Sequence, residues 1–158
     1  RETRHYGNAL LSRLPASSHR MMDLSLDSYE PRGVIQVQFD LGGHQLLVYA
    51  THLGLKPIER RYQVKQILAQ FEQETADTTV LMGDLNEWFL WGRPLRWLRA
   101  YFDITPSRRS FPSFWPLLAL DRIWVHPRSH LSGLEVHRSR LAIKASDHLP
   151  LIARIELD

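Results

Sequence analysis

Residues 79–86 read Thr79-Val80-Leu81-Met82-Gly83-Asp84-Leu85-Asn86, a run of strand-forming residues that ends in a glycine, a carboxylate and an amide. The apolar and β-branched side chains of the run are typical of a strand that is covered on both faces. Gly83 lets the backbone bend or be approached closely. Asp84 and Asn86 would point the same way if the extended backbone continued through Leu85. The stretch therefore predicts a central buried strand that ends in polar groups, although both side chains could simply satisfy the backbone of a turn.

The length and composition fit one domain, or part of one. The chain has 158 residues, 44% of them hydrophobic, which is enough for a substantial core. Lys and Arg number 20 against 17 Asp and Glu, and this net charge of +3 allows a polyanionic substrate without requiring one. Because the chain has no cysteine, disulfides and thiolate metal sites are excluded. Oxygen and imidazole ligands remain, which favours Mg²⁺, Ca²⁺ or Mn²⁺ over structural zinc.

The region before the central strand predicts three strands and a helix. Segments 34–40 and 45–51 are predicted strands, and the Gly-Gly pair between them indicates a hairpin. An earlier strand is predicted at 7–12, followed by a polar loop at 15–20. A helix is predicted from Pro57 to about Glu74, with an apolar face at Val64, Ile67, Leu68 and Phe71. The order β, β, β, α, β predicts a layered α/β fold.

The region after the central strand is rich in aromatic residues and then returns to strands. Residues 87–102 hold three tryptophans and three arginines, and they predict a loop followed by a helix that packs its aromatic face on the core. An alternative is a surface element near the site that stacks on bases or enters lipid. Further strands are predicted at 120–125, interrupted by one acid, and at 151–157.

Polar side chains recur at the ends of separate predicted strands. They are His52, the pair Asp84 and Asn86, Asp121, and the pair Asp147 and His148. Such groups are costly to bury without partners, so their recurrence predicts one convergent site. Each has an alternative when considered alone. His52 could be a hydrogen-bonded core histidine, Asp121 could form an ion pair with Arg122, and the 147–148 pair could belong to a turn.

Five short motifs span nearly the whole chain. They are Tyr6-Gly7-Asn8-Ala9-Leu10-Leu11-Ser12-Arg13, Ala50-Thr51-His52-Leu53-Gly54, Gly83-Asp84-Leu85-Asn86, Ser110-Phe111-Pro112-Ser113 with Leu120-Asp121-Arg122-Ile123, and Ser146-Asp147-His148-Leu149-Pro150. In this order they resemble the motifs of the endonuclease/exonuclease/phosphatase superfamily of metal-dependent phosphoesterases. That superfamily includes deoxyribonucleases, apurinic/apyrimidinic endonucleases, sphingomyelinases and inositol-polyphosphate phosphatases. The resemblance implies a four-layer α/β sandwich of two mixed sheets packed face to face with helices outside.

The resemblance also implies acid–base roles for three residues. His148 resembles the catalytic histidine of the superfamily, and Asp121 would orient its ring and keep it basic. His52 resembles the second histidine of the deoxyribonuclease and sphingomyelinase branches. There it contacts the phosphate or protonates the leaving oxygen.

Three further residues resemble the groups that handle metal, water and phosphate. Asp84 would position or activate the attacking water and, together with Asp147, bind the metal. Asn86 would donate a hydrogen bond to a phosphate oxygen. The implied cofactor is Mg²⁺ or Mn²⁺, which would neutralise charge on the phosphoryl oxygens during an in-line displacement.

One departure from the superfamily pattern concerns the start of the chain. The principal metal-binding glutamate of the superfamily lies upstream of the segment matched by residues 7–12, and Glu2 is too close to Tyr6 to be that residue. We therefore expect residues 1–158 to be a single domain of this superfamily that is incomplete at its N-terminus. We expect this piece alone to bind metal weakly and to have little activity.

Three functions remain open at the level of the sequence. The first is a nuclease-like phosphodiesterase, favoured by arginines at 93, 96, 99, 108 and 109. The second is a phosphodiesterase or phosphatase acting on a phospholipid head group or small phosphoester, favoured by the aromatic run 88–91. The third is a catalytically inactive interaction module, which the intact set of polar residues disfavours.

The sequence says less about partners and location. We expect a phosphoester substrate, nucleic acid or a phospholipid head group, no stable protein partner, and a monomer. Neither a signal peptide nor a run of ~20 apolar residues is visible, so we expect a cytoplasmic protein. A targeting segment could have been lost, because the chain opens at Arg1 without an initiating methionine.

Overall fold

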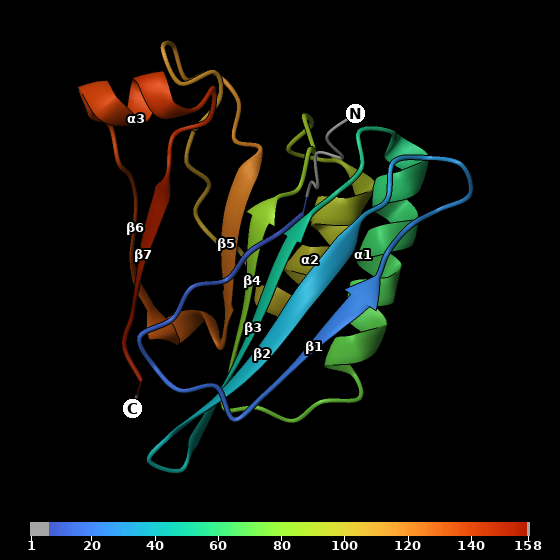
Figure 1. The fold of residues 1–158 in the computed structure, drawn as a ribbon, viewed down its shortest axis with the longest axis vertical. Helices are drawn as coiled ribbons and strands as arrows, with labels where there is room; N and C mark the ends of the chain where they lie inside the picture. The colour runs from blue at the N-terminus through green and yellow to red at the C-terminus, as the bar shows by residue number, and fades with distance from the viewer. Residues whose placement is uncertain (1–6, 158) are drawn as a thin grey trace, which may run out of the picture.

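The computed structural model describes residues 7–157 and builds them around a mixed five-stranded sheet (Figure 1). The strand order is β1-β2-β3-β4-β5, with β3 and β4 parallel and the other neighbours antiparallel. The bounds are β1 Ser18–Asp23, β2 Gly33–Leu41, β3 His44–His52, β4 Thr78–Asp84 and β5 Asp121–His126. A second, antiparallel sheet pairs β6 (Leu131–Val136) with β7 (Leu151–Ile155). The predicted α/β class is confirmed.

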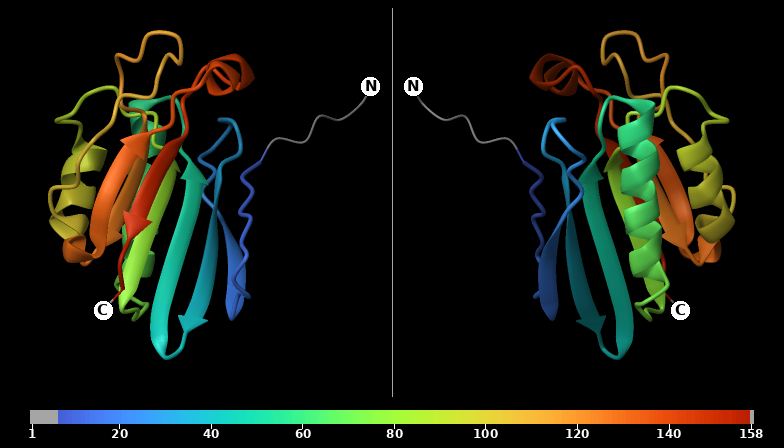
Figure 2. Two further views of the ribbon diagram at one scale, coloured as in Figure 1. Left: turned by 90° about the vertical axis from the view of Figure 1, so that its left-hand side faces the viewer. Right: turned by 90° about the vertical axis from the view of Figure 1, so that its right-hand side faces the viewer.

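Helices cover one face of the large sheet, and the small sheet lies on the other (Figure 2). The covering helices are α1 (Pro57–Phe71) and α2 (Arg93–Phe102). The helix α3 (Arg140–Ala145) joins β6 to β7, and the short 3₁₀-helix η1 (Arg128–His130) joins β5 to β6. Parallel strands need a crossover connection, and α1 supplies it between β3 and β4. Within residues 7–157, no helix is long and apolar enough to cross a membrane.

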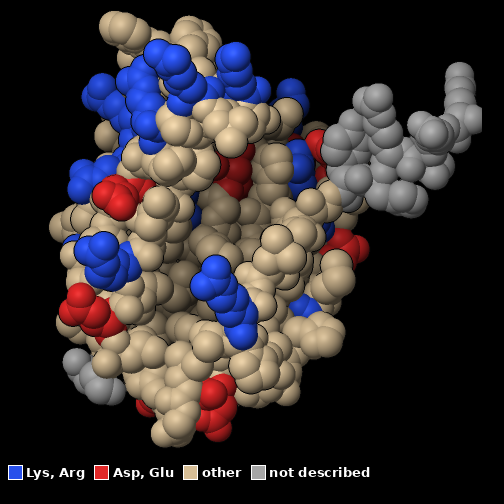
Figure 3. Space-filling view, turned by 60° about the vertical axis from the view of Figure 1, so that its left-hand side comes forward, with Lys and Arg blue, Asp and Glu red and all other residues tan. Residues whose placement is uncertain are grey.

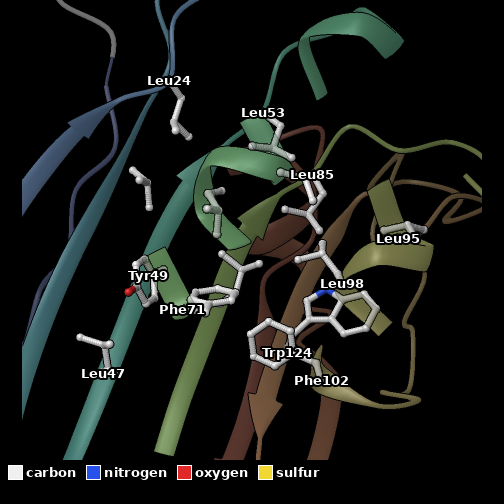
Figure 4. Packing of buried hydrophobic residues seen from close by; sticks show 14 residues of the cluster. Leu24, Leu47, Tyr49, Leu53, Phe71, Leu85, Leu95, Leu98, Phe102 and Trp124 are labelled. Atoms are coloured by element: carbon white, nitrogen blue, oxygen red, sulfur yellow. The ribbon is translucent and has the colours of Figure 1, made fainter. Parts of the chain in front are cut away.

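Two apolar clusters hold these layers together. The first lies between the large sheet and the helices α1 and α2, and it includes Tyr49, Phe71, Phe102 and Trp124 (Figure 4). The Tyr49 and Phe71 rings meet edge to face, with centroids 4.8 Å apart. The second cluster lies on the opposite face, where Leu131 of β6 joins side chains of β2 to β5. The central strand β4 is therefore covered on both faces, as its sequence predicts.

The structure corrects two predictions near the N-terminus. Residues 7–12 are not a strand, and none of the sheet pairings in the described part of the chain includes them. Strand β1 begins at Ser18, inside the segment predicted to be a loop. It lies at the edge of the large sheet with most of its side chains exposed. An edge strand is held by its backbone ladder, here with β2, so it shows little apolar periodicity.

Strand β6 was also missed by the sequence analysis. Its pairing with β7 shifts register between Leu131 and Gly133. Such an irregularity interrupts the alternation of apolar and polar side chains from which a half-buried strand is recognised.

Candidate active site

The register of the large sheet places three predicted site residues in one row. His52 is the register partner of Asp84, and Asp84 is the partner of Asp121. Neighbouring strands are separated by only ~4.8 Å, so a row of this kind brings side chains together from positions far apart in the sequence. His148 joins the row from the segment before β7. The predicted convergence of these four residues is present in the structure.

Gly83 allows β4 to approach β3 closely beside this row. Its φ of +139° lies in a region that side chains rarely adopt. A Cβ at this position would collide with the backbone carbonyl of Thr51. The residue before Asp84 must therefore be glycine for the two strand ends to meet as they do.

The extended backbone expected through Leu85 is not observed, because β4 ends at Asp84. Asn86 has a φ of +50°, and its backbone N–H donates to Asp84 Oδ1 at 2.8 Å. The Asn86 side-chain amide donates to the Leu53 carbonyl at 2.8 Å. Asp84 thus satisfies a backbone group of its own turn, as the simpler interpretation predicts, whereas the Asn86 side chain bonds to the loop that follows β3. The phosphate contact of Asn86 stays a prediction.

His148 is held by a carboxylate and an aromatic ring. Its Nδ1 lies 2.8 Å from Asp121 Oδ2, and the Ser110 hydroxyl donates to the same oxygen. The Phe111 ring packs against the imidazole, with centroids 4.8 Å apart. Burial alone would lower the pKa of His148. The hydrogen bond and charge of Asp121, with the charges of Asp84 and Asp147, nevertheless raise that pKa above its ordinary value.

Asp84 lies between the two histidines. Its Oδ2 is 3.4 Å from His52 Nε2 and 3.9 Å from His148 Nε2. Burial raises the pKa of the Asp84 carboxyl, and the nearby charge of Asp121 adds to the effect. Burial lowers the pKa of His52, and this outweighs the attraction of Asp84 for the protonated ring. The centre thus combines a crowded pair of carboxylates with two imidazoles, the groups used for proton transfer.

The donor atoms of this centre fit a divalent cation. Ligand atoms of Asp84, Asp121 and His148 all lie within 4.8 Å of one another. The carboxylate oxygens of Asp84 and Asp121 are suitable ligands for Mg²⁺ or Mn²⁺. A cation would also offset the burial and the nearby Asp121 charge, which together raise the pKa of Asp84.

Asp147 is not part of this group of three within the described residues. Its side chain is exposed, and its carbonyl accepts a hydrogen bond from the Ser113 backbone at 2.7 Å. Metal binding by Asp147 therefore stays a prediction.

A buried polar network behind the site was not foreseen from the sequence. Its members are Glu59, Arg60 and Gln63 of α1 together with Glu87. The Gln63 side chain accepts from the Gly54 backbone at 2.8 Å, and Glu59 accepts from the Lys56 backbone at 2.9 Å. The network thus anchors the loop that follows His52. A signal was present, because Arg60 lies one turn before Val64 on the buried face of the helix.

The site opens into a hollow on the face of the sheet opposite the long helices. The hollow measures about 550 Å³, and its lining includes Gly83, Asp121 and His148. Figure 3 shows acidic side chains at the upper part of a depression in this face. A neighbouring hollow of about 770 Å³ reaches His52, and Asn8 lines both. The centre is therefore accessible from solvent.

Comparisons with known proteins identify the family of the chain. The model of the endonuclease/exonuclease/phosphatase family matches residues 1–148. Uncharacterized protein YbhP of Escherichia coli (strain K12) is 35% identical over 164 residues, which cover 97% of this chain and 64% of YbhP. The chain thus spans less than two thirds of that relative.

Solved structures share the fold at low sequence identity. An endonuclease/exonuclease/phosphatase from Bacteroides vulgatus superposes with a TM-score of 0.74 at 15% identity, covering 91% of this chain and 66% of that one. Sphingomyelinase C from Streptomyces griseocarneus gives a TM-score of 0.63 at 18% identity, covering 92% and 66%. At these identities the likeness concerns the fold.

Proposed function

The chain belongs to the endonuclease/exonuclease/phosphatase family, and we propose that its site takes part in divalent-metal-dependent hydrolysis of a phosphodiester. One observation carries this proposal. A single oxygen of Asp84 lies within 4 Å of two imidazoles, and a carboxylate orients the second of them. Pairs of acids and bases held at this range are the machinery of proton transfer to and from water and leaving groups.

The pKa directions and contacts support the roles of Asp84 and His148. The role of His52 rests on its motif, because burial lowers the pKa of that ring. Asp84 orients the attacking water and accepts its proton, a task favoured by its raised pKa. The water oxygen bonds to phosphorus as the ester P–O bond breaks, and His52 gives a proton to the departing oxygen. Asp121 holds His148, and the raised pKa of His148 favours its protonated form. The protonated ring contacts the phosphoryl oxygens. Asn86 adds a hydrogen bond to the same oxygens.

Asp84 would hold the metal together with Asp147, the pair that the family motifs indicate, and Asp121 and His148 supply further donor atoms nearby. When bound, Mg²⁺ or Mn²⁺ supplies positive charge that stabilises the phosphoryl oxygens in the transition state. Under this proposal, nucleic acid and phospholipid head groups are both candidate substrates.

The test is hydrolysis of bis-p-nitrophenyl phosphate by the longest natural form of the chain, with Mg²⁺, with Mn²⁺ and with a chelator. Asp84→Asn and His148→Ala should each lower metal-dependent turnover by at least ~100-fold, the scale of general acid–base groups. His19→Ala is the matched control, because His19 is exposed on the edge strand β1. Wild-type turnover in both site variants would defeat the assignment.

If folded, metal-loaded protein shows no turnover, the result would favour the hypothesis of a catalytically inactive interaction module. That conclusion requires a direct measurement of metal binding on the same sample. Turnover and metal binding, measured together, distinguish a protein that lacks its metal from a site that binds metal but does not hydrolyse this substrate.

A further inference from the structure

The loop that follows the active-site aspartate exposes a run of large apolar side chains. Trp88, Phe89, Leu90 and Trp91 are between 49% and 71% exposed. The ring centroids of Phe89 and Trp91 lie 5.6 Å apart, so these two rings pack together within the run. Of the two interpretations of residues 87–102, a loop and a core-packed helix are confirmed, because Arg93–Phe102 is a helix that buries Leu98 and Phe102. The run 88–91 before it is exposed, as the surface interpretation predicted. A cluster of this kind on a water-facing surface marks a site of interaction.

A second exposed group lies on the loop before β5. Its members are Phe114, Trp115 and Leu117. Arg138 donates to the Phe114 carbonyl at 3.2 Å, and the Ser113 hydroxyl donates to the Ile143 carbonyl of α3 at 3.2 Å. These bonds hold the loop against α3, where Leu141 is exposed as well. The loop and the helix therefore present one surface.

Both groups surround the same end of the sheet. The first loop leaves β4 at Asp84, and the second enters β5 at Asp121, which is the register partner of Asp84. Figure 1 shows the two loops and α3 at the upper end of the molecule. We call their exposed apolar side chains the apolar rim: Trp88, Phe89, Leu90, Trp91, Phe114, Trp115, Leu117 and Leu141.

Positively charged side chains lie beside the apolar rim. Arg138, Arg140 and Lys144 are exposed in and beside α3. Residues 104–120 and 136–146 contain no Asp or Glu, so no acid within these segments neutralises them. Figure 3 shows Lys and Arg side chains gathered at the upper end of the molecule, beside projecting groups that carry no charge.

We propose that the apolar rim docks on the surface of a phospholipid bilayer that contains anionic lipid. Tryptophan settles at the boundary between head groups and acyl chains, and leucine and phenylalanine insert more deeply. The three cations match the negative surface of such a membrane. Docking would bring head-group phosphoesters to the active site, and in this respect the inference rests on the proposed hydrolytic function.

The composition of the rim favours lipid over two other partners. Single-stranded nucleic acid stacks on aromatic rings, but Leu90, Leu117 and Leu141 offer no π-face for a base. A symmetric contact with a second copy would bring the cations of α3 toward the same cations of the other copy. A membrane surface accommodates aromatic, aliphatic and cationic side chains together.

The experiment measures sedimentation of the longest natural form of the chain with sucrose-loaded vesicles. One set contains phosphatidylcholine and phosphatidylglycerol, and the other contains phosphatidylcholine alone. The variants Trp88→Ala/Trp91→Ala and Phe114→Ala/Trp115→Ala should each weaken binding by about tenfold or more, because each removes two aromatic side chains that would enter the bilayer. Arg138→Gln/Arg140→Gln/Lys144→Gln should weaken binding only to the anionic set.

Ile104→Ala is the control, because Ile104 is 83% exposed beyond the C-terminal end of α2. This variant should bind vesicles as the wild type does. All variants should retain turnover of bis-p-nitrophenyl phosphate, since no substituted residue belongs to the active site. Rim-dependent vesicle binding without turnover by metal-loaded protein would sustain the docking surface while counting against the hydrolase proposal.

Three outcomes would overturn the docking surface. The first is wild-type protein that does not sediment with either set of vesicles. The second is full vesicle binding by both aromatic variants. The third is that substitutions in the rim leave vesicle binding unchanged. In that case they would instead abolish binding of a fluorescent 20-nucleotide single strand, or abolish self-association of the protein.

Discussion

The guanidinium Nε of Arg60 lies 3.3 Å from Glu87 Oε2, and both side chains are only 5% exposed. Arg60 also donates to the Leu55 carbonyl at 2.6 Å, while Glu87 accepts from the Phe89 backbone at 3.2 Å. The pair therefore connects the loop after His52 with the loop after Asn86. Buried charges, in addition to apolar packing, hold the two loops that flank the active site.

Removing one member of this pair should destabilise the folded protein. In Glu87→Gln, Arg60 would keep its charge in a buried place without a carboxylate, so we expect the free energy of unfolding to fall by about 3 kcal/mol. Urea unfolding monitored by tryptophan fluorescence measures the change. Glu74→Gln is the matched control, because its ion pair with Arg20 is partly exposed to solvent and should contribute about 1 kcal/mol or less. Equal losses in the two variants would contradict a structural role for the buried pair.

Substitution of Gly83 should disturb the site through the backbone. In Gly83→Ala the new methyl group would collide with the Thr51 carbonyl, and the positive φ would add strain. We expect a loss of at least ~2 kcal/mol in the free energy of unfolding. Gly133→Ala in β6 is the control, since its nearest contact would be an ordinary 3.6 Å to Arg154. If both variants are equally stable, the close approach of β4 to β3 is not as described.

The titration of His148 should depend on Asp121. In the metal-free protein the pKa of His148 should lie above its ordinary value of 6.5, and Asp121→Asn should lower it. NMR of the imidazole protons measures both. The folded pKa is raised, so the stabilisation is complete below the unfolded pKa and is lost as pH rises through the folded pKa. Glu135→Gln, which removes an exposed carboxylate on β6, should leave the titration unchanged.

Metal affinity should depend on the predicted ligands. Binding of Mn²⁺, followed by electron paramagnetic resonance of the free ion, should weaken by at least about tenfold in Asp84→Asn. Asp147→Asn tests the second predicted ligand and should weaken binding too. Unchanged affinity in Asp147→Asn would remove that residue from the ligand set. Unchanged affinity in Asp84→Asn would mean that the cation binds elsewhere.

Much of the fold could be predicted because its signals are local. The hairpin of β2 and β3 is marked by Gly42 and Gly43, both with positive φ, and α1 by its apolar periodicity. Strand β1 carried no such signal, because an edge strand with exposed Ser18, His19 and Arg20 is held by its backbone ladder with β2. Residues 7–12 look like a strand by composition, yet a strand also requires a neighbour to pair with.

The sequence alone indicated which residues are candidates for the active site. Asp84, Asp121 and His148 were identified by their motifs, because a carboxylate or imidazole beside a strand end is visible locally. Tertiary structure decided which of them meet, and it left Asp147 exposed outside the group of three. It also decided that Arg60 and Glu87 are buried together. The reason is physical: propensity and spacing act over a few residues, whereas contacts between strands depend on register and crossovers that only the folded chain establishes.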